Sequence, residues 1–275
     1  ASLPSDPSCA GDPLYRQFSW GSEADIIILD ERSCRSEDVE STCQIFPGIP
    51  DPVPTLPPEI RQEFGDLGLP ANPPTGCLDA VNDPSRTFLG PVQKQLFMDA
   101  LVNSTARWKI VVNELPIQQF FLLPYDRWEG YAVERTEIIN FIRDNHIENV
   151  IFVTADTHAN LANQVYVDFF SDPQPVAEEF VTGPIATSTL EDAILSLPIN
   201  GALEAVNDLF DFIGMDCREL DAYSYGLVEI NAGSGLATIS LRDESGAILV
   251  DSSDPQISCV RTLGYDTFLP ALSVE

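Results

Sequence analysis

The sequence is poor in basic side chains. Lysine occurs only at Lys94 and Lys109, and 14 lysine and arginine residues stand against 43 aspartate and glutamate residues, so the formal net charge is −29 at pH 7. Because like charges repel, this surface does not attract nucleic-acid phosphates or anionic lipid headgroups, which argues against a nucleic-acid-binding protein. An anionic substrate would need a local site that contains metal ions or arginines.

Long hydrophobic runs are also absent. No stretch approaches 18 apolar residues, so we expect no membrane-spanning helix. Residues 1–13 have neither a basic start nor an apolar run, so we expect no signal peptide there. Hydrophobic residues make up 44% and charged residues 21% of the 275 residues, which are ordinary globular values. We therefore predict a single domain over residues 1–275.

The cysteines form no CxxC pair and no metal-binding spacing. Their even number and scattered positions in a strongly acidic chain favour disulfides, and thus a secreted, extracellular or periplasmic protein. Buried free thiols are the alternative. We predict the bridge Cys217–Cys259 and two further bridges among the four N-terminal cysteines, which are Cys9, Cys34, Cys43 and Cys77.

Hydrophobic periodicity predicts an α/β fold. Short apolar runs typical of buried strands alternate with amphipathic stretches typical of helices. A helical region follows over about 190–212, and a β-rich tail then forms a meander over residues 223–262 with its last strand at 247–250. The strands are expected at 25–30, 108–113 and 150–154, and the helices at 91–106 and 132–145.

Residues 44–86 are rich in proline and interrupt this alternation. We predict a long loop excursion, pinned by Cys43 and Cys77. A loop of this length within a compact domain is usually functional or disordered.

Polar side chains follow the three predicted strands at Asp30, Asn113 and Asp156, and His158 comes two residues later. Ligands of open α/β sheets gather at the carboxyl ends of strands. An extended backbone would place Asp156 and His158 on the same side, where a carboxylate and an imidazole suit divalent or trivalent cations. The pair is therefore a candidate metal site, although such pairs also occur by chance. The other histidine, His146, ends a helix and is expected to cap it.

The remaining candidates each have two interpretations. Arg32 could bind a phosphate through two parallel hydrogen bonds from its guanidinium group, or form an ion pair with Asp30 or Glu31. Asn113 could bind metal or cap the next turn. We expect Asp30 to fix Arg32 rather than to bind metal.

Aromatic side chains after the second strand are further candidates. Trp128 and Tyr131 could line the rim of a substrate pocket or pack in the core. Asp126 and Arg127 could simply pair with each other.

Longer blocks of the sequence resemble the PhoD-like alkaline phosphatase family, a branch of the metallophosphoesterases. Their order and spacing match along about residues 14–165, and the tail from residue 178 is similar to the closing segments of that family. The blocks are ADIIILDERSCR, RTFLGPVQKQLFMDALVNSTARWKIVVNELPIQQFF, PYDRWEGYAVERTEIINFIRDNHIENVIFVTADTHANL, EEFVTGPIATST and YSYGLVEINAGSGLATISLRDESG.

The resemblance implies a four-layer α/β/β/α sandwich and a site with two or more metal ions, calcium and iron among them. It implies that a metal-bound hydroxide attacks the phosphorus of a phosphate ester. Asp156 and His158 match metal ligands of the family, and His158 also lies near the phosphate. Arg32 matches an arginine of the L-D-x-R block and would act in catalysis and substrate binding.

The resemblance begins only at about Tyr15, so the earlier ligand blocks of the family have no counterpart here. Three buried strands and a meander also do not make two complete sheets. We therefore expect the C-terminal portion of a catalytic domain, with an N-terminal half on a separate chain or fragment that completes a phosphomonoesterase or phosphodiesterase. The alternative is a secreted non-catalytic binding or assembly subunit that retains the fold.

Overall fold

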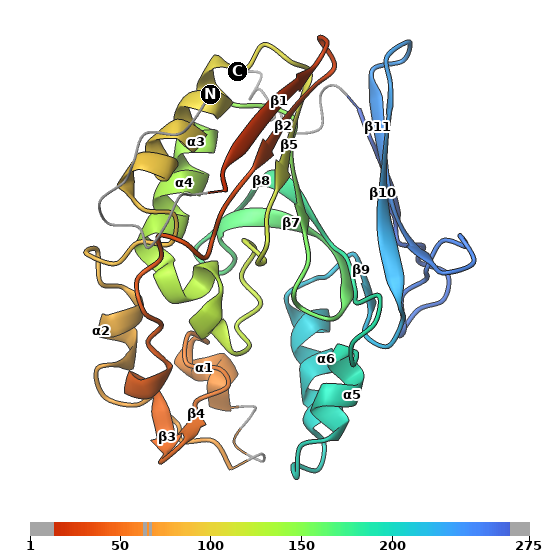
Figure 1. Cartoon of the computed structure of the whole chain (residues 1–275). Coiled ribbons are helices and arrows are strands. Elements are labelled where there is room, and N and C mark those ends of the chain that lie inside the picture. The colour runs from red at the N-terminus through yellow and green to blue at the C-terminus, as the bar shows by residue number, and fades with distance from the viewer. Residues whose placement is uncertain (1–13, 63–64, 66–67, 265–275) are drawn as a thin grey trace, which may run out of the picture.

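The computed structural model describes residues 14–62, 65 and 68–264. Figure 1 shows helices α3 (Pro91–Asn103) and α4 (Ala132–Asp144) against one face of a large central sheet. A small antiparallel sheet of β10 (Ser224–Asn231), β11 (Leu236–Asp243) and β12 (Val260–Leu263) lies against the other face. The predicted α/β class with a C-terminal β segment is confirmed, and these layers correspond to the helix, sheet and sheet of the expected sandwich.

The large sheet has seven strands in the order β1-β2-β5-β6-β8-β7-β9. The four strands β2, β5, β6 and β8 are mutually parallel, and β1 and β7 run antiparallel to their neighbours. Strands buried on both faces read as continuous apolar runs, which is why β2, β5 and β6 are recognisable in the sequence. The strands are β1 (Arg16–Trp20), β2 (Ala24–Ile28), β5 (Trp108–Val112), β6 (Val150–Thr154), β7 (Asn160–Asp168), β8 (Asp172–Val181) and β9 (Cys217–Glu219).

Four strands of this sheet were not predicted from the hydrophobic pattern of the sequence. The expectation that only three buried strands precede the C-terminal meander is therefore wrong. The strand β8 has proline at its second and fourth positions and carries Glu178 and Glu179, whose side chains are fully buried. Burial of polar residues that have partners within the fold hides the hydrophobic alternation on which the prediction depends.

The helices α3 and α4 cover one face of the sheet as predicted. Both begin where expected, and α3 has proline in its first turn, where the missing N–H costs nothing. Ile138, Ile139 and Ile142 are completely buried against the sheet in one cluster with Phe97.

The small sheet packs on the opposite face through Ile239 and Leu241, which share a cluster with Ile110 and Ile151. The predicted turns at 233–235 and 243–246 connect antiparallel segments. The prediction of a strand at 247–250 is wrong, because these residues form only isolated bridges and β12 supplies the third strand.

The carboxyl ends of the central strands lie between two further groups of elements. The helices α5 (Leu190–Leu195) and α6 (Ala202–Phe212) form one group, within the predicted helical region. The proline-rich excursion forms the other and contains short elements: β3 (Gln44–Phe46), β4 (Ile49–Pro50), α1 (Pro58–Arg61) and α2 (Cys77–Val81). Both groups contribute to one apolar cluster, which also contains Phe120, whose ring contacts that of Phe210.

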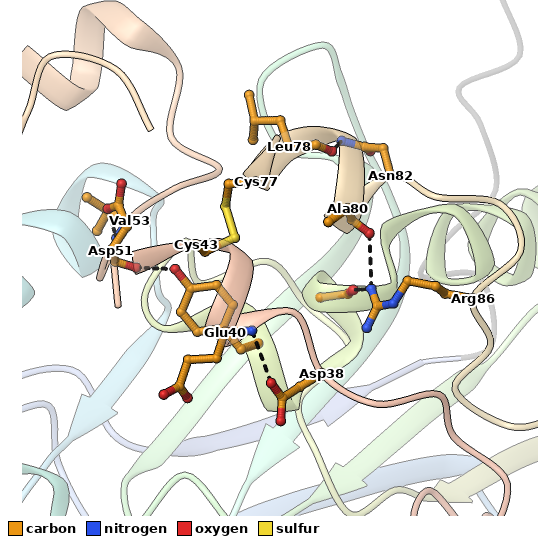
Figure 2. Close-up of a disulfide and its surroundings, with 12 residues drawn as sticks. Asp38, Glu40, Cys43, Asp51, Val53, Cys77, Leu78, Ala80, Asn82 and Arg86 are labelled. Atoms are coloured by element: carbon orange, nitrogen blue, oxygen red, sulfur yellow. Dashed lines mark hydrogen bonds between the residues drawn. A yellow bond between two sulfur atoms is a disulfide. The ribbon is translucent and has the colours of Figure 1, made fainter. Parts of the chain in front are cut away.

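Two crosslinks hold the excursion. The disulfide Cys43–Cys77 joins the residue just before the excursion to α2 within it (Figure 2). The guanidinium of Arg61 pairs with Asp51 at 2.6 Å, with both side chains fully buried, and also donates to the carbonyl oxygens of Val53 and Pro70. The carbonyl oxygens thus accept the guanidinium hydrogen bonds that Asp51 does not. A buried ion pair with such additional hydrogen bonds holds the excursion in place, although the excursion has little regular secondary structure.

The predicted disulfides are confirmed where the structure describes both partners. Cys217–Cys259 joins β9 to the segment before β12, and Cys43–Cys77 is one of the two bridges expected among the N-terminal cysteines. Cys34 is also disulfide-bonded. Cys9 lies outside the described residues.

Residues 114–123, here called the crossing segment, have no regular structure and yet are mostly buried. Three buried carboxylates accept hydrogen bonds from their backbone N–H groups. Glu31 accepts from Leu115, Glu179 from Ile117 and Gln118, and Glu129 from Phe120 and Phe121, all at 2.8–3.0 Å. Buried backbone donors need such partners where no ladder supplies them.

Two buried arginines donate hydrogen bonds to carbonyl oxygens of the crossing segment and of β7. Arg135 donates to Ile117 and, at 2.8 Å, to Val167 and Tyr166, while Arg127 donates to Leu122. Burial lowers the pKa of Arg135 to about 10, and the nearby charges of Glu129 and Glu179 oppose that shift.

A charged cluster also connects the two sheets. Arg261 of β12 pairs with Glu178 of β8 at 3.2 Å and with Asp216. Burial raises the pKa of Glu178 to about 7, although the Arg261 charge acts in the opposite direction.

The buried pair of Arg61 and Asp51 gives a stability prediction. Arg61→Met leaves the Asp51 carboxylate buried without its counter-charge and should lower the free energy of unfolding by about 3–5 kcal/mol. The double variant Asp51→Leu/Arg61→Met should recover part of that loss. Urea denaturation measures both, with Arg143→Met, which removes an exposed pair with Asp172, as the matched control at about 0–1 kcal/mol. Equal effects of Arg61→Met and Arg143→Met would contradict the prediction.

A second prediction concerns pH. The raised pKa of Glu178 means that the folded state holds this proton more tightly than the unfolded chain, so its contribution to stability is full below about pH 4.5 and is lost as the pH rises through about 7. Relative to Glu178→Gln, the wild-type protein should therefore lose stability across that window. Chemical denaturation at several pH values measures the difference, and a difference that stays constant with pH would refute the assignment.

Candidate functional site

Three neighbouring parallel strands bring the predicted residues to one edge of the large sheet. The register pairs Ile28 of β2 with Val112 of β5, and Val112 with Val153 of β6, so the three strands end side by side. Asp30, Asn113 and Asp156 follow these ends, as the crevice rule for open α/β sheets predicts. The candidate site therefore lies at the carboxyl edge, between the excursion and α5.

Arg32 is the centre of this site. Its guanidinium lies 3.2 Å from the Asp156 carboxylate, 2.8 Å from that of Asp126 and 3.4 Å from that of Glu114. The ion pairs expected with Asp30 or Glu31 are thus replaced by pairs with three other carboxylates. Burial lowers the pKa of Arg32, but the hydrogen bond with Asp126 and the surrounding negative charges outweigh burial and raise it overall.

Asp30 holds the turn that carries Arg32. Its carboxylate accepts hydrogen bonds from the backbone N–H groups of Leu14, Arg32 and Ser33 and from the Ser33 hydroxyl. Burial raises the pKa of Asp30, and these bonds together lower it below its ordinary value. The expectation that Asp30 fixes Arg32 is confirmed.

Asp126 joins two arginines. One of its oxygens contacts Arg32 and the other contacts Arg35. The expected pair of Asp126 with Arg127 is wrong, because Arg127 turns inward to Glu129 at 3.0 Å. Neighbours in sequence point to different sides here, since Arg127 lies between the two 3₁₀ turns 124–126 and 128–131.

Sequence reasoning missed Arg35 and Glu114. Glu114 directly follows Asn113 at the end of β5, so its position at a strand end was a usable signal. Burial raises the pKa of Glu114, and the charge of Arg32 opposes that shift. Nothing in the sequence singles out Arg35, whose partner is 91 residues away.

Asp156 and His158 occupy an unusual backbone. Their φ angles are 63° and 60°, in the left-handed region, so the expectation of an extended backbone is wrong. Aspartate and histidine tolerate this region better than most side chains, but it is still sparsely populated and commonly marks functional loops.

The imidazole of His158 is held on one side. Its Nδ1 lies 2.7 Å from the carbonyl oxygen of Ser188 and 3.2 Å from the hydroxyl of Thr187. Because a carbonyl oxygen only accepts, Nδ1 is the nitrogen that donates to Ser188, and in the neutral ring Nε2 is the nitrogen with the lone pair. This is the arrangement that orients a histidine to bind a metal through Nε2. The ring of His146 is elsewhere, past α4, where its backbone N–H donates to Arg143.

Asn113 has the contacts of a capping residue. It is 4% exposed, its amide nitrogen donates to the carbonyl oxygen of Leu115, and its amide oxygen accepts from the indole N–H of Trp128 at 3.1 Å. A metal-binding role for Asn113 stays a prediction that these contacts do not favour.

Trp128 and Tyr131 lie in the core. They are 0% and 1% exposed, and both rings pack against Phe88 with ring centres 4.5 and 4.7 Å apart. The indole N–H of Trp128 is bonded to Glu31 as well as Asn113. A substrate contact at a pocket rim requires an exposed ring, so the packing alternative describes both residues better.

A shallow hollow of about 420 Å³ adjoins the arginines. Two arginines, two acidic residues and two serines line it. Its lining consists of Arg32, Arg35, Ser36, Glu37, Asp38 and Ser41.

The metal donors form an incomplete set. Within the described part of the chain, no group of three or more His, Cys, Asp and Glu side chains is placed to hold a metal ion. Asp156 and His158 offer two donors, fewer than even one cation needs from carboxylate and imidazole ligands. The residues present therefore do not by themselves fit a site for two or more ions.

The comparisons with known proteins agree with this fold. The sequence profile of PhoD-like phosphatases matches residues 3–239. Alkaline phosphatase D of Bacillus subtilis is 27% identical over 176 residues, which are 62% of this chain and 24% of that protein. A solved structure of PhoD superposes with a TM-score of 0.63 at 21% identity, over 96% of this chain and 45% of the other.

These relatives are longer than the present chain, which spans less than half of each. The structural likeness concerns the fold, because the identity is low. The profile match, in contrast, extends over most of the sequence and includes every residue of the carboxyl-edge site. The chain therefore belongs to the PhoD-like phosphatase family.

Proposed function

We propose that this chain contributes to metal-dependent hydrolysis of phosphate esters, and that Arg32, Asp156 and His158 are its share of the site. One observation carries the proposal. A guanidinium and a carboxylate from two different strand ends are in contact, and a histidine oriented through Nδ1 follows two residues after that carboxylate. The family membership makes phosphoester hydrolysis the reaction to test.

Arg32 would bind and orient the substrate phosphate. A guanidinium presents paired N–H donors that match two phosphate oxygens. Its donors face Asp156, Asp126 and Glu114 in the structure. A phosphate would compete for those donors and release the Asp156 carboxylate for another partner.

Asp156 and His158 would be the metal ligands. A carboxylate oxygen suits calcium, and an imidazole nitrogen suits iron, so this donor pair is compatible with the calcium and iron that we propose as cofactors. When bound, such ions would lower the pKa of water and neutralise charge that develops on the phosphate. The missing donors would come from the part of PhoD-like proteins that this chain does not span, on a preceding segment or a second chain.

We further propose a secreted, extracellular or periplasmic location. The bridges Cys43–Cys77 and Cys217–Cys259 fit an oxidising compartment. Over the described residues, no helix has the length and apolar character needed to cross a membrane.

One observation favours a second candidate function, a non-catalytic binding or assembly subunit. The described residues lack a complete set of metal donors. A denaturing gel of native material separates the two functions. A co-purifying polypeptide of comparable size together with bound metal supports the hydrolase, while a single metal-free band supports the subunit.

The two histidines provide a matched test of the site. In the native protein, with whatever polypeptide accompanies it, Asp156→Ala and His158→Ala should lower bound metal and reduce turnover of 4-nitrophenyl phosphate and bis(4-nitrophenyl) phosphate. The reduction should exceed the roughly 10- to 100-fold loss typical when only a supporting residue behind a ligand is removed. His146→Ala, exposed beyond α4, should leave both readouts unchanged. Full activity in His158→Ala would contradict the assignment of His158 as a metal ligand.

A second test concerns Arg32. Arg32→Lys keeps the charge but loses the fork, so kcat/KM should fall roughly 10- to 100-fold, the equivalent of one or two charge-assisted hydrogen bonds. Arg143→Lys, with comparable side-chain exposure and two surface carboxylate partners, is the control and should behave as wild type. Bound metal should stay constant in both variants, and a parallel loss of metal in Arg32→Lys would point to a structural role instead.

A further inference from the structure

The end of α3 carries a sequence motif that the proposed function does not use. Asn103, Ser104 and Thr105 form the N-x-S/T triplet at which oligosaccharides are attached to asparagine in secreted proteins. The triplet occurs once in the 275-residue sequence. Because such triplets also arise by chance, the position of its three side chains in the fold decides whether a sugar can be carried there.

The fold brings two of these side chains to the surface. The helix α3 ends at Asn103, and Ser104 is the residue that follows it as the cap. The Ser104 hydroxyl donates to the Asp25 carboxylate of β2 at 2.6 Å, so this side chain turns toward the sheet. Asn103 and Thr105 on either side of it are exposed. The amide that accepts the sugar and the hydroxyl of the triplet therefore both belong to surface side chains.

The amide of Asn103 keeps a donor when a sugar is attached. Its nitrogen donates to the carbonyl oxygen of Asp99 at 2.8 Å. An asparagine amide has two N–H groups, and a glycosidic bond replaces only one of them, so the other remains available for a hydrogen bond.

Two other exposed asparagines have the same local geometry. Asn82 and Asn145 follow the ends of α2 and α4, and their amide nitrogens donate to carbonyl oxygens four residues earlier at 2.8 and 2.9 Å. Figure 2 shows this contact for Asn82 and Leu78. Neither asparagine has serine or threonine two positions later. They differ from Asn103 in the triplet alone, which makes them matched controls.

A polar hollow lies beside the triplet. Its volume is about 430 Å³, and it is bounded by residues of β1 and of the end of α3. Gln17, Ser19, Asp25 and Asp99 are among the side chains that line it. Amide, hydroxyl and carboxylate groups of this kind form hydrogen bonds with sugar hydroxyls. The surface next to Asn103 thus has both the room and the chemistry for a first sugar.

Asn103 is remote from the carboxyl-edge site. The strand β5 begins at Trp108, shortly after Asn103, and runs parallel to β2 and β6 toward the carboxyl edge. The end of α3 therefore adjoins the amino ends of these strands, at the opposite edge of the sheet (Figure 1). An oligosaccharide at this position does not cover Arg32 or Asp156.

We propose that Asn103 carries an N-linked oligosaccharide in the secreted protein. The donor is an oligosaccharide linked to a lipid diphosphate. The amide nitrogen of Asn103 forms a bond to the anomeric carbon of the first sugar, the bond from that carbon to the diphosphate oxygen breaks, and the lipid diphosphate leaves with the electron pair while the amide proton passes to a base. The inference rests on the proposed secreted location and is independent of the proposed hydrolysis.

Peptide mass spectrometry of the native secreted protein tests the proposal. Trypsin cleaves after Lys94 and Arg107, so residues 95–107 form one peptide in which Asn103 is the only asparagine. This peptide should carry the added mass of an oligosaccharide, and fragmentation should place that mass on Asn103. An amidase specific for N-linked oligosaccharides should remove the added mass and convert the asparagine into aspartate.

Variants separate the triplet from its surroundings. Asn103→Gln and Thr105→Ala should each abolish the added mass, whereas Thr105→Ser keeps the hydroxyl and should retain it. The controls Asn82→Gln and Asn145→Gln, which remove the same hydrogen bond at other helix ends, should leave the oligosaccharide in place. Asn103→Gln should also leave bound metal and phosphoester turnover unchanged, because the site lies at the opposite edge of the sheet.

An unmodified 95–107 peptide in the native secreted protein would overturn the proposal. So would an added mass that persists in Asn103→Gln, or that fragmentation places on Ser104 or Thr105, because either result identifies an O-linked sugar instead. The disulfides Cys43–Cys77 and Cys217–Cys259, mapped in the same digest, distinguish the possible failures. Intact disulfides with an unmodified peptide would refute the oligosaccharide and leave the secreted location standing. Loss of turnover with a glycosylated peptide would refute only the hydrolytic proposal.

Discussion

Hydrogen bonds between buried charged side chains and the backbone of the crossing segment are the interaction on which the rest of the structure depends. Residues 114–123 run through the interior without a ladder, and unmet peptide groups there would cost free energy comparable to lost hydrogen bonds. The N–H groups donate to the carboxylates of Glu31, Glu129 and Glu179. The carbonyl oxygens accept hydrogen bonds from Arg127 and Arg135. Because these five come from the turn after β2, the turns before α4, α4 itself and β8, the segment ties the sheet and one helical layer together. The backbone N–H of Leu123 also donates to Pro52 of the excursion.

The carboxyl-edge site inherits its shape from this arrangement. The segment begins at Glu114, one of the carboxylates around Arg32, and Asn113 immediately before it is bonded to the same indole as Glu31. Any shift of the crossing segment would move Glu114 relative to Arg32 and Asp156. The position of the site is thus set by buried electrostatics rather than by the apolar core alone.

The parts of the fold that were predictable from sequence are those with uninterrupted apolar periodicity. β2, β5, β6, α3 and α4 follow this rule, and the strand-end rule then located Asp30, Asn113 and Asp156. β8 was missed because its buried Glu178 and Glu179 look like surface residues, and the orientation of Arg127 because a neighbour in sequence was taken as a partner in space. Contacts such as Arg35 with Asp126 join residues 91 positions apart, and no local pattern encodes them. The family resemblance supplied the roles proposed for Asp156 and His158, whose left-handed backbone could not be derived from an apolar run.

The disulfide Cys217–Cys259 has a consequence for how the chain unfolds. It closes a loop with a sequence separation of 42 that contains both β10 and β11, and it anchors the small sheet to β9 of the large one. Because the crosslink also restricts the unfolded chain, the two sheets stay attached at this point even when their apolar contacts open. Reduction of this bond would therefore remove an attachment that packing alone does not replace.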